Sequence, residues 1–333
     1  MDFELSEDEV ALAEGIRSLC AGRFPLEKIR SAEDGDGLLD RAGWAELAEA
    51  GVFSLQVPEA SGGVGLGMAA AAVVFEELGR ALVPGPLLAT HLAATSGLVD
   101  GAADGKVVVG AVSRPAPSGG SGPSALAPTL VGHFSSLGLL LLVGDDGLTA
   151  IDPSEIEAVP IARSLDPLTP LWRVDRFPEG RLIGGPEEAG NWRRGQSVLG
   201  GALLVGLAGG TMEMAVAYAK QREQFGKPIG SFQAVKHMCA DMLVAAETAR
   251  AAVHAAAVTI DQPGVGDPDR AAYGAGLLAS EAAIKNGKTS IQVHGGMGFT
   301  WEVPAHLYLM RARILSEAIG PIDGLAEKLA EIF

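Results

Sequence analysis

The fold is decided by the stretch Tyr218-Ala-Lys-Gln-Arg-Glu-Gln-Phe-Gly-Lys-Pro-Ile-Gly-Ser-Phe-Gln-Ala-Val-Lys-His237, which predicts the end of one helix, a sharp turn and the start of a second long helix. Gly226 can supply the left-handed residue that ends a helix, and Pro228 cannot continue one. Ser231 is a suitable N-cap for the apolar run that follows at helical spacing. The stretch therefore predicts two helices joined as a helical hairpin.

Two side chains of this turn, Arg222 and Phe225, lie beside the predicted helix N-terminus. A guanidinium, an aromatic ring and free backbone N–H groups together suit a nucleotide that carries phosphates. The alternative is a surface ion pair for the arginine and a core position for the ring. Taken alone, the turn leaves both interpretations open.

A second stretch, Ile291-Gln-Val-His-Gly-Gly-Met-Gly-Phe-Thr-Trp-Glu302, follows a long helical pattern. Its glycines fall where a helix must stop and where backbone can approach a ligand closely. Together with Arg222-Glu-Gln-Phe-Gly-Lys-Pro-Ile-Gly-Ser-Phe-Gln233, this stretch resembles the two signatures of the acyl-CoA dehydrogenase family, in the expected order. A weaker resemblance extends over nearly the whole chain.

The composition narrows the function classes. The 333 residues are 48% hydrophobic, which is enough for a large core and for two or three domains. A net charge of −16 argues against nucleic acid as a partner, because binding to phosphate backbones needs a basic surface. The two cysteines, Cys20 and Cys239, fall in helical patterns, so a disulfide is not expected and a reducing cytoplasm fits. We find no signal peptide and no uninterrupted apolar segment of membrane-spanning length, so we expect no membrane partner.

Residues 1–105 are predicted to form an N-terminal α-helical domain. Ser6 and Glu9 form a capping-box pattern at the start of an amphipathic helix. Further helices are expected at residues 39–50 and 68–82, with a short extended segment at residues 52–57.

Residues 106–187 are predicted to form an abbreviated β domain, and residues 188–333 a C-terminal four-helix bundle, so the fold class is α+β. Short apolar or alternating runs, separated by Pro, Gly, Ser and Asp, predict strands at residues 107–109, 139–143, 148–151 and 171–174. The low-complexity segment 115–128 is predicted to be a flexible loop. Helices are expected at about 195–224, 231–260 and 268–294, with a shorter pair after Pro304.

The resemblance implies a reaction, the α,β-desaturation of an acyl-CoA thioester. Such a reaction requires a carboxylate base for the α proton and FAD to take the β hydride. In the family the base comes from one of two positions, which fall here on Ile319 and Gln196. Neither side chain accepts a proton at neutral pH, so we predict no catalytic base in this chain.

The resemblance also implies a cofactor role for seven residues. They match family positions that reach across a subunit interface to the ADP half of an FAD bound mainly by the neighbouring subunit: Arg222, Gln224, Phe225, Ile229, Gln292, Gly295 and Gly296. The positions that hold the flavin ring differ, since Ser113-Arg114-Pro115 stands where the family has Thr-Glu-Pro. A Trp-x-Thr segment that flanks the ring in the family has no counterpart, and Trp172 lies too late to supply one.

The chain keeps the residues that reach the FAD of a neighbouring subunit, but it lacks the family residues that hold a flavin ring of its own. In this respect it resembles the short non-catalytic subunit of actinobacterial α2β2 steroid-CoA dehydrogenases. This resemblance implies a longer acyl-CoA dehydrogenase subunit as partner, a bulky acyl-CoA substrate and electron-transferring flavoprotein as electron acceptor. The acyl group itself cannot be deduced from the sequence.

Two other functions stay open. A self-sufficient homotetramer could take its base from Glu281, Glu302 or Glu317, of which Glu317 is the best fallback because it lies two residues from Ile319. A flavin-free scaffold of the same fold is the second. A metal site is not expected, because the histidines are scattered without ligand spacing.

Overall fold

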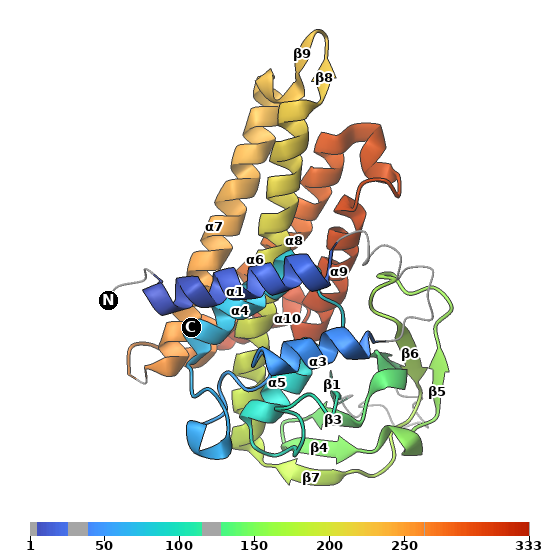
Figure 1. Ribbon diagram of the computed structural model, residues 1–333. Helices are drawn as coiled ribbons and strands as arrows, with labels where there is room; N and C mark the ends of the chain where they lie inside the picture. The colour runs from blue at the N-terminus through green and yellow to red at the C-terminus, as the bar shows by residue number, and fades with distance from the viewer. Residues whose placement is uncertain (1–4, 26–38, 115–127, 263, 333) are drawn as a thin grey trace. The chain divides into compact units, whose positions relative to one another are not determined.

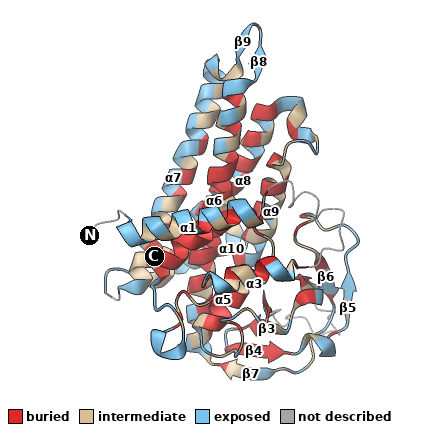
Figure 2. Cartoon of the chain, viewed as in Figure 1, coloured by how far each residue is buried: buried red, intermediate tan, exposed pale blue. Residues whose placement is uncertain are grey.

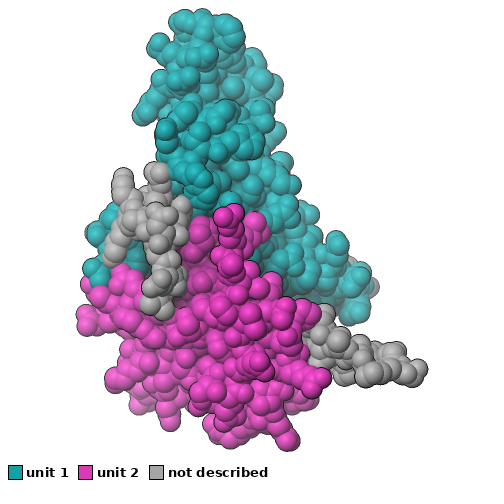
Figure 3. Space-filling view, turned by 90° about the vertical axis from the view of Figure 1, so that its right-hand side faces the viewer, with its two compact units in different colours: residues 1–30, 67–83, 194–333 teal, residues 31–66, 84–193 magenta. Residues whose placement is uncertain are grey.

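The computed structural model describes residues 5–25, 39–114, 128–262 and 264–332. Helices occupy the first and last parts of the chain and short strands the middle, as Figure 1 shows, and this confirms the α+β fold class. By packing, the chain divides into two compact units, coloured in Figure 3. Unit 1 comprises Met1–Arg30, Gly67–Val83 and Arg194–Phe333, and unit 2 comprises Ser31–Leu66 and Pro84–Arg193. The boundaries 1–105, 106–187 and 188–333 follow element type instead, and as domain boundaries they stay a prediction.

Unit 1 is helical. Its helices are α1 (Glu7–Arg23), α4 (Met68–Arg80), most of α6 (Pro186–Gln221), α7 (Gln233–Asp261), α8 (Pro268–His294), α9 (Ala305–Ile319) and α10 (Ile322–Ile332). The predicted capping box is confirmed, because the Ser6 hydroxyl accepts from the Glu9 backbone N–H while the Glu9 side chain accepts from the Ser6 backbone. The predicted long helices of the bundle are confirmed as α6, α7 and α8, although α6 begins earlier than expected, at Pro186.

Glycines let α4 and α6 pack with their backbones in contact. A Cβ at Gly79 would lie 2.1 Å from the Leu203 carbonyl oxygen, and one at Gly206 would lie 2.0 Å from that of Glu76. No side chain larger than hydrogen fits at either position, because real Cβ contacts are never this short. This close crossing places α4 across the middle of α6.

Unit 2 combines helices α3 (Arg41–Glu49) and α5 (Leu87–Thr95) with two small sheets. One sheet has the order β1-β3-β4-β7, with β1 (Val109–Ser113) parallel to β3 (Leu139–Val143) and the other pairs antiparallel. The other sheet is antiparallel, with the order β2-β6-β5. The remaining strands are β2 (Thr129–Gly132), β4 (Leu148–Ile151), β5 (Ala158–Pro160), β6 (Leu171–Val174) and β7 (Arg181–Gly184).

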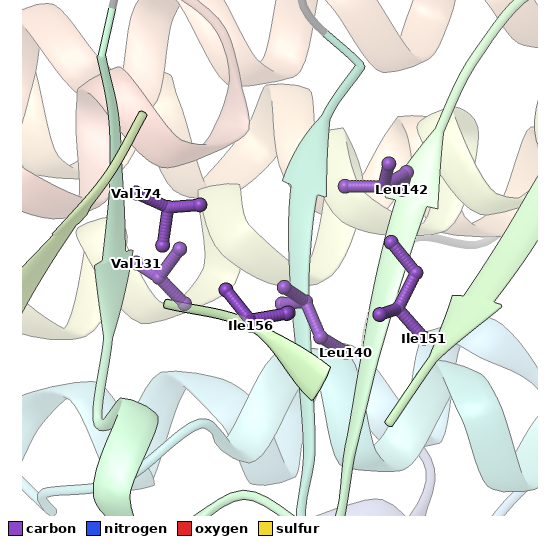
Figure 4. Close-up of a cluster of buried hydrophobic side chains, with 6 residues drawn as sticks. All are labelled: Val131, Leu140, Leu142, Ile151, Ile156 and Val174. Atoms are coloured by element: carbon purple, nitrogen blue, oxygen red, sulfur yellow. The ribbon is translucent and has the colours of Figure 1, made fainter. Parts of the chain in front are cut away.

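The two sheets share one apolar core. Side chains from both sheets, and one from the segment between β4 and β5, turn toward one another in Figure 4. They belong to Val131, Leu140, Leu142, Ile151, Ile156 and Val174, each at most 8% exposed. The predicted strands 139–143, 148–151 and 171–174 are confirmed as β3, β4 and β6, since each contributes to this core.

Several local predictions were wrong. Residues 52–57 form consecutive turns rather than an extended segment, and the first strand starts at Val109 rather than Val107. The N-cap of α7 is Phe232 and not Ser231, because residues Ile229–Ser231 form a short 3₁₀ turn first. The predicted loop 115–128 lies almost entirely outside the described residues.

Candidate functional site

The turn between α6 and α7 is a β-hairpin. Strand β8 (Glu223–Gln224) pairs antiparallel with β9 (Lys227–Pro228), and the Ile229 backbone N–H donates to the Arg222 carbonyl at 2.8 Å. Phe225 and Gly226, the two residues of the turn, have φ of 55° and 76°. Positive φ at both central residues is typical of the type I′ turn of tight hairpins. The hairpin stands at the end of α6 and α7 in Figure 1 and holds the Phe225 side chain 92% exposed.

The end of α8 is the second part of the candidate site. His294 is the last residue of α8, and Gly295, with φ 60°, is the first residue of a 3₁₀ turn, η6 (Gly295–Phe299). Around Gly295 and Gly296 no heavy atom lies within 4 Å of where a Cβ would be, so this backbone is open to a ligand. Gly298 is different, because a Cβ there would lie 2.5 Å from the Ile291 carbonyl oxygen. The third glycine of the motif therefore serves packing.

One packing cluster joins the hairpin to the end of α8. Val293 of α8 belongs to the same buried cluster as Ala219 of α6, and Ile229 packs against it. The rings of Tyr218 and His294 lie against each other, with centroids 4.3 Å apart and planes tilted by 31°. All seven predicted cofactor residues consequently lie at one end of unit 1. Ile229 is partly buried there, and the other six are exposed: Arg222, Gln224, Phe225, Gln292, Gly295 and Gly296.

The donor chemistry of this end fits part of a dinucleotide. The Arg222 guanidinium makes no ion pair with any residue that the structure describes, and it is exposed together with the amides of Gln224 and Gln292. A guanidinium and amide N–H groups are suitable donors for phosphate oxygens. The assignment of the seven residues to a cofactor half-site stays a prediction.

Two further residues, Lys227 and Phe232, contact the hairpin tip or one another. The Phe232 ring lies edge-on to Phe225 with centroids 6.1 Å apart, and the Lys227 ammonium lies 4.5 Å above the Phe232 ring. Alternation of aromatic and basic residues in the motif was the only sequence signal for these contacts. These contacts connect the tip of the hairpin to Phe232 at the start of α7.

The two substrate-base positions lie next to each other. The Gln196 side-chain N–H donates to the Ala318 carbonyl oxygen at 2.5 Å, directly before Ile319 in α9. Ile319 is 5% exposed, and a Cβ placed on Gly276 would lie 3.7 Å from its Cδ1 atom. An amide and a methyl group thus occupy the two positions at which the family resemblance predicts the base.

None of the fallback carboxylates points into this place. Glu317 is exposed while its neighbour Ser316 is 3% exposed, so the acid lies on the solvent face of α9. Glu281 and Glu302 are exposed as well. In the described ranges, no group of three or more His, Cys, Asp or Glu residues could hold a metal ion.

The segment that replaces the family's flavin contact is engaged elsewhere. Arg114 donates to the Asp146 carboxylate at 2.8 Å and also to the Thr149 hydroxyl. The Trp172 ring packs near Phe134, with centroids 6.2 Å apart. Both side chains serve the surface or the packing of unit 2.

Comparisons with known proteins cover nearly the whole chain. The family model described as "Acyl-CoA dehydrogenase, N-terminal domain" matches residues 6–103, and "Acyl-CoA dehydrogenase, C-terminal domain" matches residues 196–332. Acyl-CoA dehydrogenase IpdE2 of Mycobacterium tuberculosis is 36% identical over 307 residues, covering 92% of this chain and 91% of that protein.

Two solved structures share the fold. The ChsE4-ChsE5 complex from Mycobacterium tuberculosis contains a chain with a TM-score of 0.85 at 23% identity, covering 100% of this chain and 98% of that one. The steroid ACAD Tcur3481-Tcur3483, in a variant form, contains a chain with a TM-score of 0.81 at 23% identity, covering 98% and 97%.

Proposed function

The chain belongs to the acyl-CoA dehydrogenase family of FAD-dependent oxidoreductases, and on this premise we propose that it is a non-catalytic subunit of a heteromeric member. In this proposal it supplies the half-site for the ADP moiety of an FAD that a longer acyl-CoA dehydrogenase subunit holds. The assembly is α2β2 and desaturates a bulky, steroid-derived acyl-CoA thioester. Electrons leave to electron-transferring flavoprotein, and the assembly is cytoplasmic.

The observation that carries the proposal is the pair Gln196 and Ile319. Proton abstraction next to a thioester carbonyl needs a carboxylate within hydrogen-bond reach of the substrate. The two positions that can supply it meet in this structure, and both are neutral, with the Gln196 amide bound to the Ala318 carbonyl. FAD, when bound, supplies the acceptor for the β hydride. In this proposal, the partner subunit therefore supplies the carboxylate base.

The exposed half-site supports the same conclusion. Arg222, Gln224 and Gln292 offer N–H donors to solvent, and Gly295 and Gly296 leave backbone uncovered beside them. A ligand held from this side alone would keep most of its surface in water, whereas bound dinucleotides and drug-sized ligands are mostly buried. We infer that a second subunit covers the opposite side and that Arg222 neutralises the pyrophosphate charge.

The surface of α7 also favours an assembly. By length and composition alone, α6 and α7 could both span a membrane. The most apolar 18-residue stretch of α6 is 83% buried within the chain, whereas that of α7 is only 28% buried. Helix α6 is therefore a core helix. On α7, Leu243 and Val244 are 46% and 64% exposed. Apolar surface of this kind is characteristic of an interaction site, and we assign it to the subunit interface.

The substrate class rests on relatives. The solved neighbour Tcur3481-Tcur3483 is titled a steroid ACAD, and ChsE4-ChsE5 is a complex of two different proteins. The Mycobacterium tuberculosis relative IpdE2 matches this chain over almost its full length. These similarities support a heteromeric enzyme that acts on steroid-derived acyl-CoA.

The test compares separate and joint expression. The chain is purified alone and together with each full-length acyl-CoA dehydrogenase of the same genome, and FAD content and oxidation of a steroid side-chain CoA thioester are measured. We expect FAD retention and activity only in a joint preparation. Stoichiometric FAD and activity in the chain alone would establish the homomeric enzyme, and a colourless joint complex would favour the flavin-free scaffold.

A further inference from the structure

Three large aromatic side chains are exposed at the half-site end of unit 1. Phe225, Phe299 and Trp301 are 92%, 85% and 58% exposed, and this end is coloured largely as exposed in Figure 2. Two other tryptophans, Trp44 and Trp192, are only 3% and 4% exposed. Aromatic side chains contribute much of the binding free energy of protein interfaces when they are buried there. In this chain alone, these three rings remain exposed to water.

The segment that carries Phe299 and Trp301 is well fixed to the bundle. Gly298 packs directly on the Ile291 backbone, and both the N–H and the hydroxyl of Thr300 donate to the Met297 carbonyl, at 3.0 and 2.8 Å. The Trp301 ring stands edge-on to His306 with centroids 4.5 Å apart. Both rings are therefore presented by a defined turn, and binding through them would cost little ordering entropy.

The position of these rings relates them to the predicted cofactor residues. They lie on or directly after the turn that begins with Gly295 and Gly296, and just before this turn Val293 shares a cluster with Ile229, the residue that follows the hairpin. A subunit whose bound cofactor places its ADP moiety against Arg222 and Gln292 would also contact this turn. We propose that Phe299 and Trp301 are the docking anchors for the flavin-bearing partner subunit, an inference that rests on the proposed function.

The chemistry of the surroundings fits that partner. Aromatic residues and arginine dominate the energetics of protein interfaces when they lie centrally and become desolvated. On and beside the hairpin, the exposed cations Lys220, Arg222 and Lys227 outnumber the acidic Glu223, although the whole chain has a net charge of −16. The hairpin is thus basic, and it suits a subunit that presents an anionic nucleotide at the contact.

The first experiment measures the affinity for the partner. The full-length acyl-CoA dehydrogenase that the tagged chain retains is titrated against wild type, Trp301→Ala, Phe299→Ala and Leu182→Ala. Leu182 is a matched control, because it is also 58% exposed but lies on strand β7 of unit 2. We expect each aromatic substitution to weaken binding at least about tenfold, as interface hot spots do, and Leu182→Ala to leave it unchanged.

The second experiment observes the ring directly. This chain alone is labelled with 5-fluorotryptophan, and the Trp301 resonance in the ¹⁹F spectrum is identified with Trp301→Phe. Addition of unlabelled partner should shift that resonance and leave those of the buried Trp44 and Trp192 in place. Because both substituted side chains are exposed, the variants should keep the wild-type unfolding midpoint.

The outcomes separate the inference from the proposed function. The inference is overturned if the partner binds the aromatic variants as tightly as wild type. It is also overturned if Val244→Glu on α7 is the only substitution that abolishes binding. Either result leaves the proposed function standing. Arg222→Ala should keep the partner and lose FAD. A chain that retains none of the dehydrogenases, forms only homo-oligomers, or binds through these rings to phosphatidylglycerol vesicles overturns both.

Discussion

The side-chain amide of Gln196 on α6 donates a hydrogen bond to the backbone carbonyl of Ala318 at the end of α9. This contact ties the middle of the chain to a residue 122 positions later. It also fixes the turn in which Ile319 packs over Gly276 and Leu325 approaches Gly320. At the two positions where the family resemblance predicts the base, this chain thus has a structural contact.

Gln196→Glu is expected to destabilise the chain by about 1–2 kcal/mol. The substitution replaces an N–H donor by a carboxylate oxygen that faces the Ala318 carbonyl, so a hydrogen bond is lost and a repulsion gained. Urea unfolding at pH 7 measures the change, with Gln196→Ala as a control for the lost bond alone. The glutamate should not make the isolated chain active. Dehydrogenase activity in that variant alone would contradict our account of the missing flavin contacts.

Glu317→Gln should leave the activity of the assembly within about twofold of wild type. The side chain is exposed on the solvent face of α9, away from the place of Ile319. Changes to surface residues away from special features are usually neutral. Steady-state kinetics with the joint preparation measure the effect. A loss of several orders of magnitude in kcat would identify Glu317 as the base and support a self-sufficient enzyme.

Phe225→Asn should raise stability by roughly 1 kcal/mol and lower FAD retention. A phenylalanine at φ 55° pays the steric cost of the left-handed region, which asparagine tolerates better. Thermal unfolding and FAD content of the joint preparation report the two effects. Phe225→Ala is the matched control, because it also removes the ring but lowers the steric strain of the left-handed backbone less than asparagine does. Equal FAD retention in all three proteins would show that the ring does not contact the cofactor.

His91 should make the stability of unit 2 depend on pH. Burial lowers the pKa of its imidazole to about 4, while the Nδ1 atom lies 2.8 Å from the Val52 carbonyl oxygen. The unfolded chain, with a histidine pKa near 6.5, then binds a proton that the folded chain does not, so stability falls as the pH falls from about 6.5 to 4. The loss from this group between pH 7 and pH 5 is about 2 kcal/mol.

Urea unfolding of wild type and His91→Asn at pH 7 and pH 5 checks this prediction. Asparagine keeps an N–H donor near Val52 but does not titrate in this range. The variant should be less stable at pH 7 and should lose about 2 kcal/mol less than wild type on acidification. Parallel losses in the two proteins would show that His91 is not the titrating group.

Long helices and the core strands could be predicted from the sequence. The helices α6, α7 and α8 have apolar residues at helical spacing over seven turns or more, and β3, β4 and β6 have runs that are buried in one core. Strands β2, β5 and β7 were missed because they lie at sheet edges, where Leu130, Val159 and Leu182 are 52%, 47% and 58% exposed. An edge strand buries little, so its sequence carries a weak pattern.

The sequence by itself determined the family, the order of element types and the identity of the side chains at the two base positions, because these depend on local patterns and on motifs read along the chain. Only the tertiary structure decided that Gln196 meets Ala318, that Val293 and Ile229 share one cluster, and that Phe225, Phe299 and Trp301 remain uncovered. Such contacts join residues far apart in sequence. They follow from how whole helices pack against each other, and no local pattern encodes that packing.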